Sequence, residues 1–151
     1  MAEHFKTLSA VFPVIFKTEN NKTYVLLHRR LNTGYQDGNL DIAGSGHVDE
    51  GETAKMATAR ECKEELGIDV SIEDLTFIHL SHRFTDRVYY DMYFRVDKYI
   101  GTPSIMEPDK CSELGWFDID NLPDDMIECR KIVMNEYKNG HNYTEFLQEI
   151  N

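Results

Sequence analysis

The chain has 151 residues, enough to bury one core and too few for two, so residues 1–151 are predicted to form a single domain. Its apolar fraction of 41% and charged fraction of 28% are typical of a soluble globular protein. The formal net charge of −11 gives an acidic surface that repels a phosphate backbone, which argues against duplex nucleic acid as a main partner.

Strands are predicted where apolar, β-branched and aromatic residues run together. In chain order they are residues 9–16, a strand beginning at 24–27, short strands at 40–43 and 47–48, longer strands at 75–83 and 88–96, and a short strand ending at 116–117. Turn-forming residues separate the first two strands at 19–22 and fill the loop 32–39. The first two strands are therefore expected to form a hairpin.

Two helices are predicted among these strands. Thr53 is placed to cap the first, which is expected to run to about Leu66, and Gly67 stands where a left-handed helix end is common. The second is expected over about residues 125–138, after a break at residues 121–123. Strands and helices thus mix along the chain, which indicates an α+β fold with a sheet covered by helices on both faces.

The location of the protein is predicted from what the sequence lacks. No apolar run approaches the roughly 20 residues that cross a bilayer, and Met1–Lys6 does not begin a secretory signal. Cys62, Cys111 and Cys129 are odd in number, far apart and in no C-x-x-C pair, which indicates reduced, packed thiols rather than disulfides or a zinc site. A cytoplasmic protein without a membrane partner is expected.

Three glutamates share one side of the first predicted helix. Glu61, Glu64 and Glu65 stand at i, i+3 and i+4, within an arc of roughly 100°. Each pair of like charges costs a few tenths of a kcal/mol on an isolated helix, and the helix dipole disfavours anions near the C-terminal end. A sequence selected for helix stability alone would not place them there, although such a trio taken alone more often simply faces water.

The residues that flank the glutamates favour a metal site. Gly46 and Gly51 permit a tight backbone course ahead of the helix, and Glu52 lies just before its first turn. The planar fork of Arg60 is suited to bridging the carboxylates or holding Glu52. A hard dication such as Mg²⁺ takes oxygen ligands from one or two carboxylates, waters and substrate phosphates. The sequence therefore predicts a cation site between the glycines and the helix.

The run from Gly46 to Ile68 resembles the Nudix box, G-x5-E-x7-R-E-U-x-E-E-x-G-U, in which U is an aliphatic residue. Every polar and glycine position of that pattern is present. Cys62 replaces an aliphatic residue, and because buried cysteine behaves as a small hydrophobe this affects packing rather than catalysis. Residues 43–46, Ala-Gly-Ser-Gly, replace the commoner Pro-Gly-Gly. The box covers about a sixth of the chain.

The resemblance implies a MutT-like hydrolase with the Nudix fold, a mixed β-sheet sandwiched between helices (α/β/α). It implies Mg²⁺ or Mn²⁺ as cofactor, because the family uses these ions in the attack of water on phosphorus. The implied metal ligands are Glu61, Glu64, Glu65 and the carbonyl of Ser45. Glu52 and Arg60 would form a supporting ion pair in the catalytic site. The general base stays open between Glu61 and a glutamate outside the box.

Three charged residues outside the box are candidates for substrate or metal binding. The segment that begins at Glu107 resembles part of relatives that hydrolyse nucleoside triphosphates, so Glu107 is a candidate ligand of metal or water; the alternative is an acid that caps a loop. Arg29 and Arg30 end a strand and are candidates for phosphate binding. Arg30 aligns best with the phosphate-contacting arginine of MutT-like enzymes, and the alternative for both is a surface salt bridge.

The substrate is the least determined part of the prediction. Tyr35, Phe84 and Tyr89 are able to stack on a base, but strand aromatics more often belong to the core. The proline found about 16 residues after the box in ADP-ribose enzymes, and the tyrosine about 17 residues after it in dinucleoside-polyphosphate enzymes, are replaced by Phe84 and Thr85. Their absence favours a (d)NTP, released as the monophosphate and pyrophosphate.

Other functions stay open beside this one. An isopentenyl-diphosphate isomerase resembles the family, but its cysteine ahead of the box is replaced by Gly44 and Ser45. A hydrolase of ADP-ribose or a nucleotide sugar keeps the same site. A non-catalytic nucleotide-binding module usually loses a box glutamate, and none is missing here. Many relatives are dimers, so a homodimer stays open too.

Overall fold

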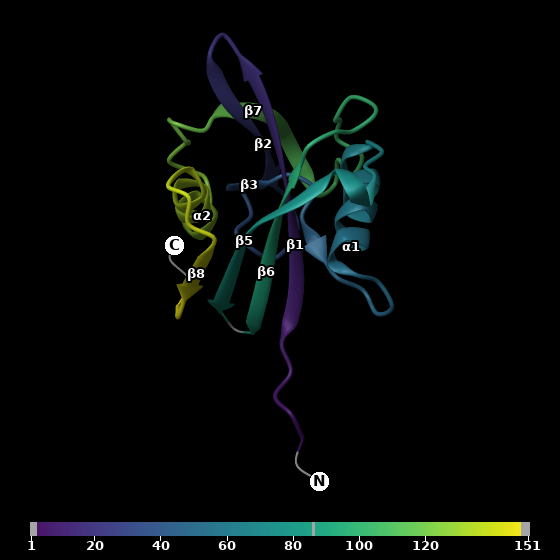
Figure 1. The fold of residues 1–151 in the computed structure, drawn as a ribbon, viewed down its shortest axis with the longest axis vertical. Coiled ribbons are helices and arrows are strands. Elements are labelled where there is room, and N and C mark those ends of the chain that lie inside the picture. Colours follow the sequence, from purple (N-terminus) through teal and green to yellow (C-terminus); the bar gives the residue numbers. More distant parts are fainter. Residues whose placement is uncertain (1–2, 86, 149–151) are drawn as a thin grey trace.

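The fold was analysed in a computed structural model, which describes residues 3–85 and 87–148 (Figure 1). The strands are β1 (Leu8–Glu19), β2 (Lys22–Arg30), β3 (Leu40–Ile42), β4 (Gly46–His47), β5 (Leu75–Phe84), β6 (Val88–Val96), β7 (Cys111–Asp118) and β8 (Tyr143–Phe146). The helices are α1 (Ala54–Glu61), the π-helical turn η1 (Cys62–Leu66), the 3₁₀ turn η2 (Ile72–Asp74) and α2 (Glu128–Lys138).

The strands form one mixed sheet with helices on both faces. Its order is β3-β2-β1-β6-β5-β8, while β4 pairs with β1 and β7 with β2. The pairs β1–β6 and β5–β8 are parallel and the other strand pairs antiparallel. Figure 1 shows α2 on one side of the sheet and α1 on the other. The predicted α/β/α sandwich with a mixed sheet is confirmed.

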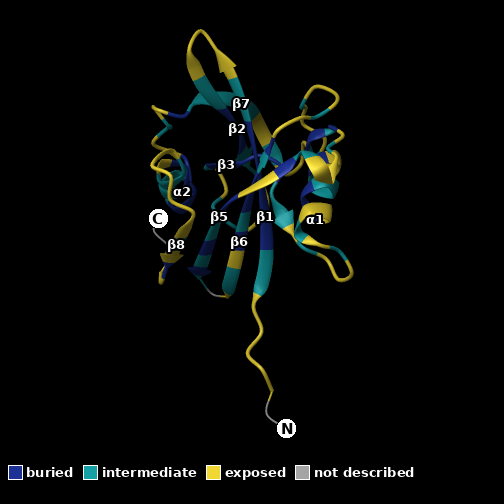
Figure 2. Ribbon diagram, viewed as in Figure 1, coloured by how far each residue is buried: buried dark blue, intermediate teal, exposed yellow. Residues whose placement is uncertain are grey.

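Strand β1 divides the core between the two faces of the sheet. Successive side chains of a strand point to opposite faces, so Phe12 and Val14 pack toward α2, whereas Val11 and Ile15 pack toward α1. All four are at most 3% exposed. Figure 2 shows the buried residues concentrated in the sheet and on the helix faces that cover it. A strand buried on both faces explains the continuous apolar run in its sequence.

The first hairpin turns where the sequence predicts. Asn20 and Asn21 have φ of 54° and 63°, and Glu19 pairs with Lys22 across the two-residue turn. Asparagine tolerates the left-handed region better than most residues, and two consecutive positive φ values match the twist of a tight hairpin. The predicted turn at residues 19–22 is confirmed.

The first helix has the predicted ends but not a uniform interior. The Thr53 hydroxyl accepts a hydrogen bond from the backbone N–H of Met56, and Gly67 ends the segment with φ of 70°. The α-helix itself stops at Glu61, and residues 62–66 continue as a π-helical turn. The helix predicted to run to about Leu66 is therefore confirmed in extent, and its last five residues are π-helical rather than α-helical.

The C-terminal part contains two further corrections. Helix α2 begins at Glu128, three residues later than predicted, because the backbone of Leu40 donates to Asp125 and accepts from Ile127. These bonds hold the preceding segment extended against β3. Strand β8 was not predicted; its short, largely polar run buries Phe146 and pairs in parallel with β5.

The cysteines agree with the prediction of packed thiols outside disulfides. Cys62 and Cys129 are buried, Cys111 is half-buried, and none of the three is in a disulfide. Cys62 packs among the apolar residues between α1 and the sheet, as expected of a small hydrophobe. Among the described residues, no helix is long and apolar enough to cross a membrane.

Candidate active site

A close approach of backbone and carboxylate begins the site. Strand β4 pairs with β1 through Ala10–His47 and Val11–Gly46, which brings Gly46 beside the end of α1. A Cβ added to Gly46 would lie 2.2 Å from the carboxyl carbon of Glu61. Because real Cβ atoms do not come that close, glycine is required at this position if Glu61 is to keep its place.

Arg60 joins three glutamates of the site and fixes their orientation. Its Nε and Nη2 donate to the two carboxylate oxygens of Glu52 at 3.0 and 2.7 Å. Its Nη1 donates to Glu61 at 2.8 Å and to Glu64 at 3.1 Å. The hydrogen bond from Arg60 lowers the pKa of Glu52 to about 2, so Glu52 is a stable anion in this pair. The predicted contact between Glu52 and Arg60 is confirmed as a bidentate ion pair.

The carboxyl groups of Glu61 and Glu65 have too little positive charge near them to offset the cost of burying an anion. Burial raises the pKa of Glu61 to about 7, although Arg60 opposes the shift. Burial, followed by the charges of Glu61 and Glu107, raises the pKa of Glu65 to about 8. The Oε2 atom of Glu65 is buried and has no hydrogen-bond partner. A buried carboxylate oxygen without a donor is costly, and a cation beside it would remove that cost.

The acids that were predicted as metal ligands are close neighbours but not an assembled coordination shell. Across residues 3–85 and 87–148, no group of three or more His, Cys, Asp or Glu side chains is arranged to hold a metal ion. Glu64 is 54% exposed and turned toward Arg60. The chemistry nevertheless fits a hard dication, because Glu61, Glu65 and Glu107 supply carboxylate oxygens and the Glu65 oxygen is unpartnered.

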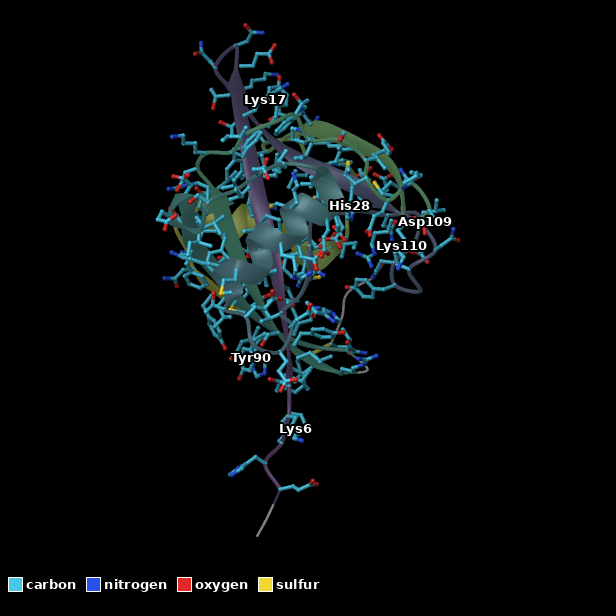
Figure 3. The ribbon with its side chains drawn as sticks, turned by 90° about the vertical axis from the view of Figure 1, so that its right-hand side faces the viewer. Lys6, Lys17, His28, Tyr90, Asp109 and Lys110 are labelled. Carbon is cyan, nitrogen blue, oxygen red and sulfur yellow. The ribbon has the colours of Figure 1, made fainter. Side chains whose placement is uncertain are left out.

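Two adjoining cavities meet at this acidic region. The larger, of about 560 Å³, is bounded by Gly46 and His47 and extends toward β5 and β6. The smaller, of about 200 Å³, contains Glu65 and Glu107. Figure 3 labels His28 and Lys110, which both line this smaller cavity. The residues shared by both cavities are Arg30, Thr33 and Ser45.

The floor of the larger cavity is a buried network of two arginines and two aspartates. Arg83 donates to both carboxylate oxygens of Asp91, at 2.7 and 3.1 Å. Arg130 donates to Asp41 at 3.0 Å and lies 3.6 Å from Asp91. All four side chains are at most 5% exposed. Arg30 donates to the second oxygen of Asp41 at 3.0 Å and joins this network to the acidic region.

A sequence profile of the NUDIX domain matches residues 7–137. The chain belongs to the Nudix family. The matched range spans the acidic region and the residues that line the larger cavity. It also contains the stretch from Gly46 to Ile68 that resembles the Nudix box. This family assignment confirms the resemblance of residues 46–68 to the Nudix box.

Relatives within the Nudix family have different substrates. Dihydroneopterin triphosphate diphosphatase of Escherichia coli (strain K12) is 36% identical over 87 residues, 50% of this chain and 55% of that protein. NAD-capped RNA hydrolase NudC of Vibrio atlanticus (strain LGP32) is 35% identical over 118 residues, 76% of this chain and 40% of that protein. The chain spans about half the length of these curated relatives.

A solved structure supports the Nudix fold. The crystal structure of MutT NUDIX hydrolase from Burkholderia pseudomallei superimposes with a TM-score of 0.75 and 23% sequence identity. The similarity covers 87% of this chain and 98% of that one. At this identity the likeness concerns the fold alone.

The structure separates the two arginines that the sequence grouped together. Arg30 lines both cavities, whereas Arg29 donates to Glu113 at 2.8 Å and to Asp125 at 2.6 Å and lines neither. Glu107 lies in the smaller cavity near Glu65, rather than serving only to cap its loop. Of the predicted pair, Arg30 is thus beside the Nudix box, and Arg29 has the alternative role of a surface ion pair.

Sequence reasoning missed the charged floor of the Nudix cleft. Arg83 and Asp91 are buried charged residues within two paired strands, β5 and β6. A charge in a buried strand needs a partner, and these two lie on adjacent strands of a hairpin, two residues apart in register. Applied to the sequence, that rule would have predicted an ion pair between Arg83 and Asp91. Nothing in the sequence indicated that Arg130, 39 residues further along, joins them.

Proposed function

We propose that the protein is a Mg²⁺- or Mn²⁺-dependent hydrolase that cleaves a phosphoanhydride bond in a nucleoside diphosphate linked to another group. The preferred substrate is a (d)NTP, which gives the monophosphate and pyrophosphate. The observation that carries the proposal is the buried, unpartnered Oε2 of Glu65, which lines the smaller cavity together with Glu107 and is repelled by the charges of Glu61 and Glu107. A cation bound to this oxygen would neutralise the negative charge of a pyrophosphate, which the carboxylates of the site would otherwise repel.

The proposed metal ligands are Glu61, Glu64, Glu65, the carbonyl of Ser45 and Glu107. A bound dication would supply charge neutralisation for the anhydride oxygens and a lower pKa for an attacking water. Arg60 orients Glu61 through the hydrogen bond at 2.8 Å, and Glu52 in turn fixes Arg60. Glu64 contacts the same guanidinium, and its carboxylate would leave Arg60 to bind the cation. Proton removal from water requires a carboxylate in its ionised form, a condition that applies to Glu61 or Glu65.

Arg30 is proposed to bind the phosphates. It lines both cavities, and its side chain is 17% exposed while Asp41 and the carbonyl of Tyr35 hold its inner nitrogens. A guanidinium fixed on one edge presents the other edge to a ligand with little loss of freedom. The organic part of the substrate would then lie in the larger cavity, whose 560 Å³ are of the size common for small-molecule sites. Three cysteines outside any disulfide fit a reducing, cytoplasmic location.

The test is a substrate panel with Mg²⁺ and with EDTA, comprising dNTPs, oxidised dNTPs, ADP-ribose, nucleotide sugars, dinucleoside polyphosphates and isopentenyl diphosphate. Release of monophosphate and pyrophosphate from a triphosphate, lost in EDTA, is expected. Glu64→Gln and Glu65→Gln should each lower kcat/KM by about a hundredfold or more while the circular dichroism spectrum is retained. Glu73→Gln, at an exposed glutamate five residues beyond the end of the box, is the control. Equal turnover by all variants would refute the site assignment.

A further inference from the structure

The loop between β2 and β3 borders both cavities of the Nudix cleft. Thr33 lines both of them, and Gly34 and Tyr35 line the larger one. The Tyr35 ring centre lies 5.1 Å from the guanidinium of Arg30 and 5.7 Å from that of Arg83. Any contact that fixes this loop therefore also shapes the cleft in which the substrate is proposed to bind.

The backbone of this loop has conformations that most residues avoid. Positive φ angles occur at every second residue: 55° at Asn32, 82° at Gly34, 50° at Gln36 and 89° at Gly38. This alternation is not that of a regular β-turn. Side chains other than that of glycine are disfavoured in the left-handed region unless surrounding contacts hold the backbone there. The loop thus depends on specific contacts to keep its shape.

The exposed carboxylate of Asp37 supplies several of these contacts. It accepts hydrogen bonds from the backbone N–H of Thr33 at 3.0 Å, from the Thr33 hydroxyl at 2.6 Å, and from the backbone N–H of Gly34 at 2.9 Å. The Thr33 hydroxyl oxygen in turn accepts from the backbone N–H of Tyr35 at 3.2 Å. The hydrogen bond from the Thr33 side chain, followed by that from Gly34, lowers the pKa of Asp37, so the loop is built around the anion.

The same loop directs the side chain of Arg30. The carbonyl of Tyr35 accepts from Arg30 Nε at 2.7 Å, and Asp41 accepts from Arg30 Nη1 at 3.0 Å. Asp41 is buried in the floor of the larger cavity and is fixed by the fold. The Tyr35 carbonyl, by contrast, keeps its position only while the loop keeps its shape. One of the two acceptors that direct this guanidinium therefore depends on Asp37.

We propose that Asp37 is a positioning residue for substrate binding: its carboxylate fixes residues 33–35, and through the Tyr35 carbonyl it orients Arg30 for the phosphates. This proposal rests on the proposed function, in which Arg30 binds the phosphates. Asp37 itself lines neither cavity, so it acts through these neighbours. An interaction that is equally strong in the bound substrate and in the transition state changes KM and leaves kcat unaltered. Loss of Asp37 should therefore weaken binding without slowing the chemical step.

Steady-state kinetics with a nucleoside triphosphate and Mg²⁺ provide the first test. Asp37→Ala removes both acceptor oxygens and is expected to raise KM about fivefold, the effect of roughly one hydrogen bond, with kcat retained. Asp37→Asn keeps one acceptor oxygen and should give a smaller rise, about twofold. Asp124→Asn, at an exposed aspartate outside both cavities, is the matched control and should leave both constants unchanged. An unchanged KM in folded Asp37→Ala, or a fall in kcat alone, would overturn the proposal.

A double-mutant cycle tests whether Asp37 acts through Arg30. In an Arg30→Gln background no guanidinium is left to orient, so adding Asp37→Ala should not raise KM further. If the two single effects on KM instead multiply, Asp37 acts on the substrate independently of Arg30, and the proposed route is wrong.

A measurement without substrate separates this proposal from the proposed function. In ¹H–¹⁵N NMR spectra of the full chain, the Arg30 Nε–H should be protected from exchange with water by the Tyr35 carbonyl, and Asp37→Ala should speed that exchange about tenfold. The Arg95 Nε–H, which donates to Asp97 outside both cavities, is the control signal and should not change.

The two kinds of failure are then distinct. Faster exchange at Arg30 in Asp37→Ala, together with no hydrolysis of any triphosphate by the parent, would support the positioning role and refute the hydrolase assignment. Hydrolysis of triphosphates by the parent, together with unchanged exchange at Arg30 in Asp37→Ala, would support the hydrolase assignment and refute the role of Asp37.

Discussion

The acidic region and the floor of the cleft each bury two carboxylates, and they stabilise them in opposite ways. In the floor, burial alone would raise the pKa of Asp41, but the guanidinium groups of Arg130 and Arg30 outweigh it and lower that pKa. In the acidic region, Arg60 reaches Glu61 but not Glu65, and the pKa of Glu65 rises to about 8. A buried carboxyl group is therefore a stable anion in the floor, whereas the one at Glu65 in the acidic region is partly protonated.

This difference distinguishes a region that contributes to the stability of the fold from a region whose charges are balanced only when a ligand binds. A buried ion pair whose partners are all present is structural, and loss of one partner leaves an uncompensated charge. A buried carboxylate without a partner lowers stability until something binds it, which is characteristic of functional sites. The side chains of the floor are thus expected to be fixed in place when the protein folds, and those of the acidic region when a cation binds.

The largest expected effect tests this contrast in stability. Asp91→Asn leaves Arg83 and Arg130 buried without their shared carboxylate, so the free energy of unfolding should fall by about 3–5 kcal/mol. Glu65→Gln removes a charge that has no partner, so without metal it should cost little or should stabilise the protein. Urea denaturation of both variants in EDTA measures the two values. Equal losses would erase the proposed distinction.

A smaller effect is expected from crowding the acidic region. The Cβ introduced by Gly46→Ala would push the Glu61 carboxyl group, the far end of a flexible side chain, out of its position. The expected fall in kcat/KM is about ten- to a hundredfold, because a misplacement of about 1 Å is costly in an active site.

Gly115→Ala is the matched control for this crowding experiment. The added Cβ there meets a ring atom of Phe117 at 3.4 Å, and the position is in β7. Its activity should remain close to that of the parent, as measured on the preferred triphosphate. Full activity in Gly46→Ala would mean that the position of Glu61 is unimportant.

The neighbouring arginines give a sharper comparison with a still smaller effect. Arg30→Gln should raise KM about tenfold for a triphosphate, because Arg30 reaches both cavities and one charge-assisted contact contributes roughly 1.5–3 kcal/mol. Arg29→Gln should leave KM unchanged and cost at most about 1 kcal/mol in stability, since it loses partly exposed ion pairs. Steady-state kinetics of both variants decide between them. Similar KM values for the two would remove Arg30 from the phosphate site.

The last comparison is the pH dependence of stability, in which the expected change per pH unit is small. The pKa of Glu65 in the folded protein, about 8, lies above the ordinary value of 4.5, so the folded state holds the proton more tightly than the unfolded state. Its contribution is fully present below about pH 4.5 and is lost as pH rises through 8, with a slope of at most about 1.4 kcal/mol per pH unit. Glu65→Gln should therefore gain stability relative to the parent between pH 5 and 8, in EDTA.

The difference between parent and variant is the quantity to measure, because buried histidines act in the opposite direction. Burial lowers the pKa of His28 and of His79, so each destabilises the fold as pH falls below about 6.5. Subtraction cancels their contribution. Parallel stability curves for parent and Glu65→Gln would contradict the raised pKa.

Local signals made most of the fold predictable from the sequence. The apolar run of β1, the asparagine turn after it, the Thr53 cap and the Gly67 stop all depend on residues a few positions apart. The start of α2 and the whole of β8 depend instead on backbone pairing with β3 and β5, which lie far away in the chain. Such pairing leaves no mark in the local sequence.

The same distinction applies to the candidate site. The spacing of Glu61, Glu64 and Glu65 is a local pattern, and it led to the Nudix family. Arg29 and Arg30 follow one another in β2 and so point to opposite faces, but which of the two faces the cavities depends on tertiary partners, Glu113 and Asp125 for Arg29 and Asp41 for Arg30. The network of Arg83, Asp91 and Arg130 joins β5, β6 and α2, so only the tertiary structure reveals it.

The wide turn at Cys62–Leu66 has a consequence for how this site can vary. A π-helical turn contains one residue more than an α-helical one, and such turns occur mostly as single additions at functional positions. Removing Lys63, an exposed residue, would shorten the turn and rotate Glu64 and Glu65 by about 100° relative to Glu61. Insertions and deletions within this segment should therefore be rejected more strictly than replacements at Lys63, since the alignment of the acids depends on chain length.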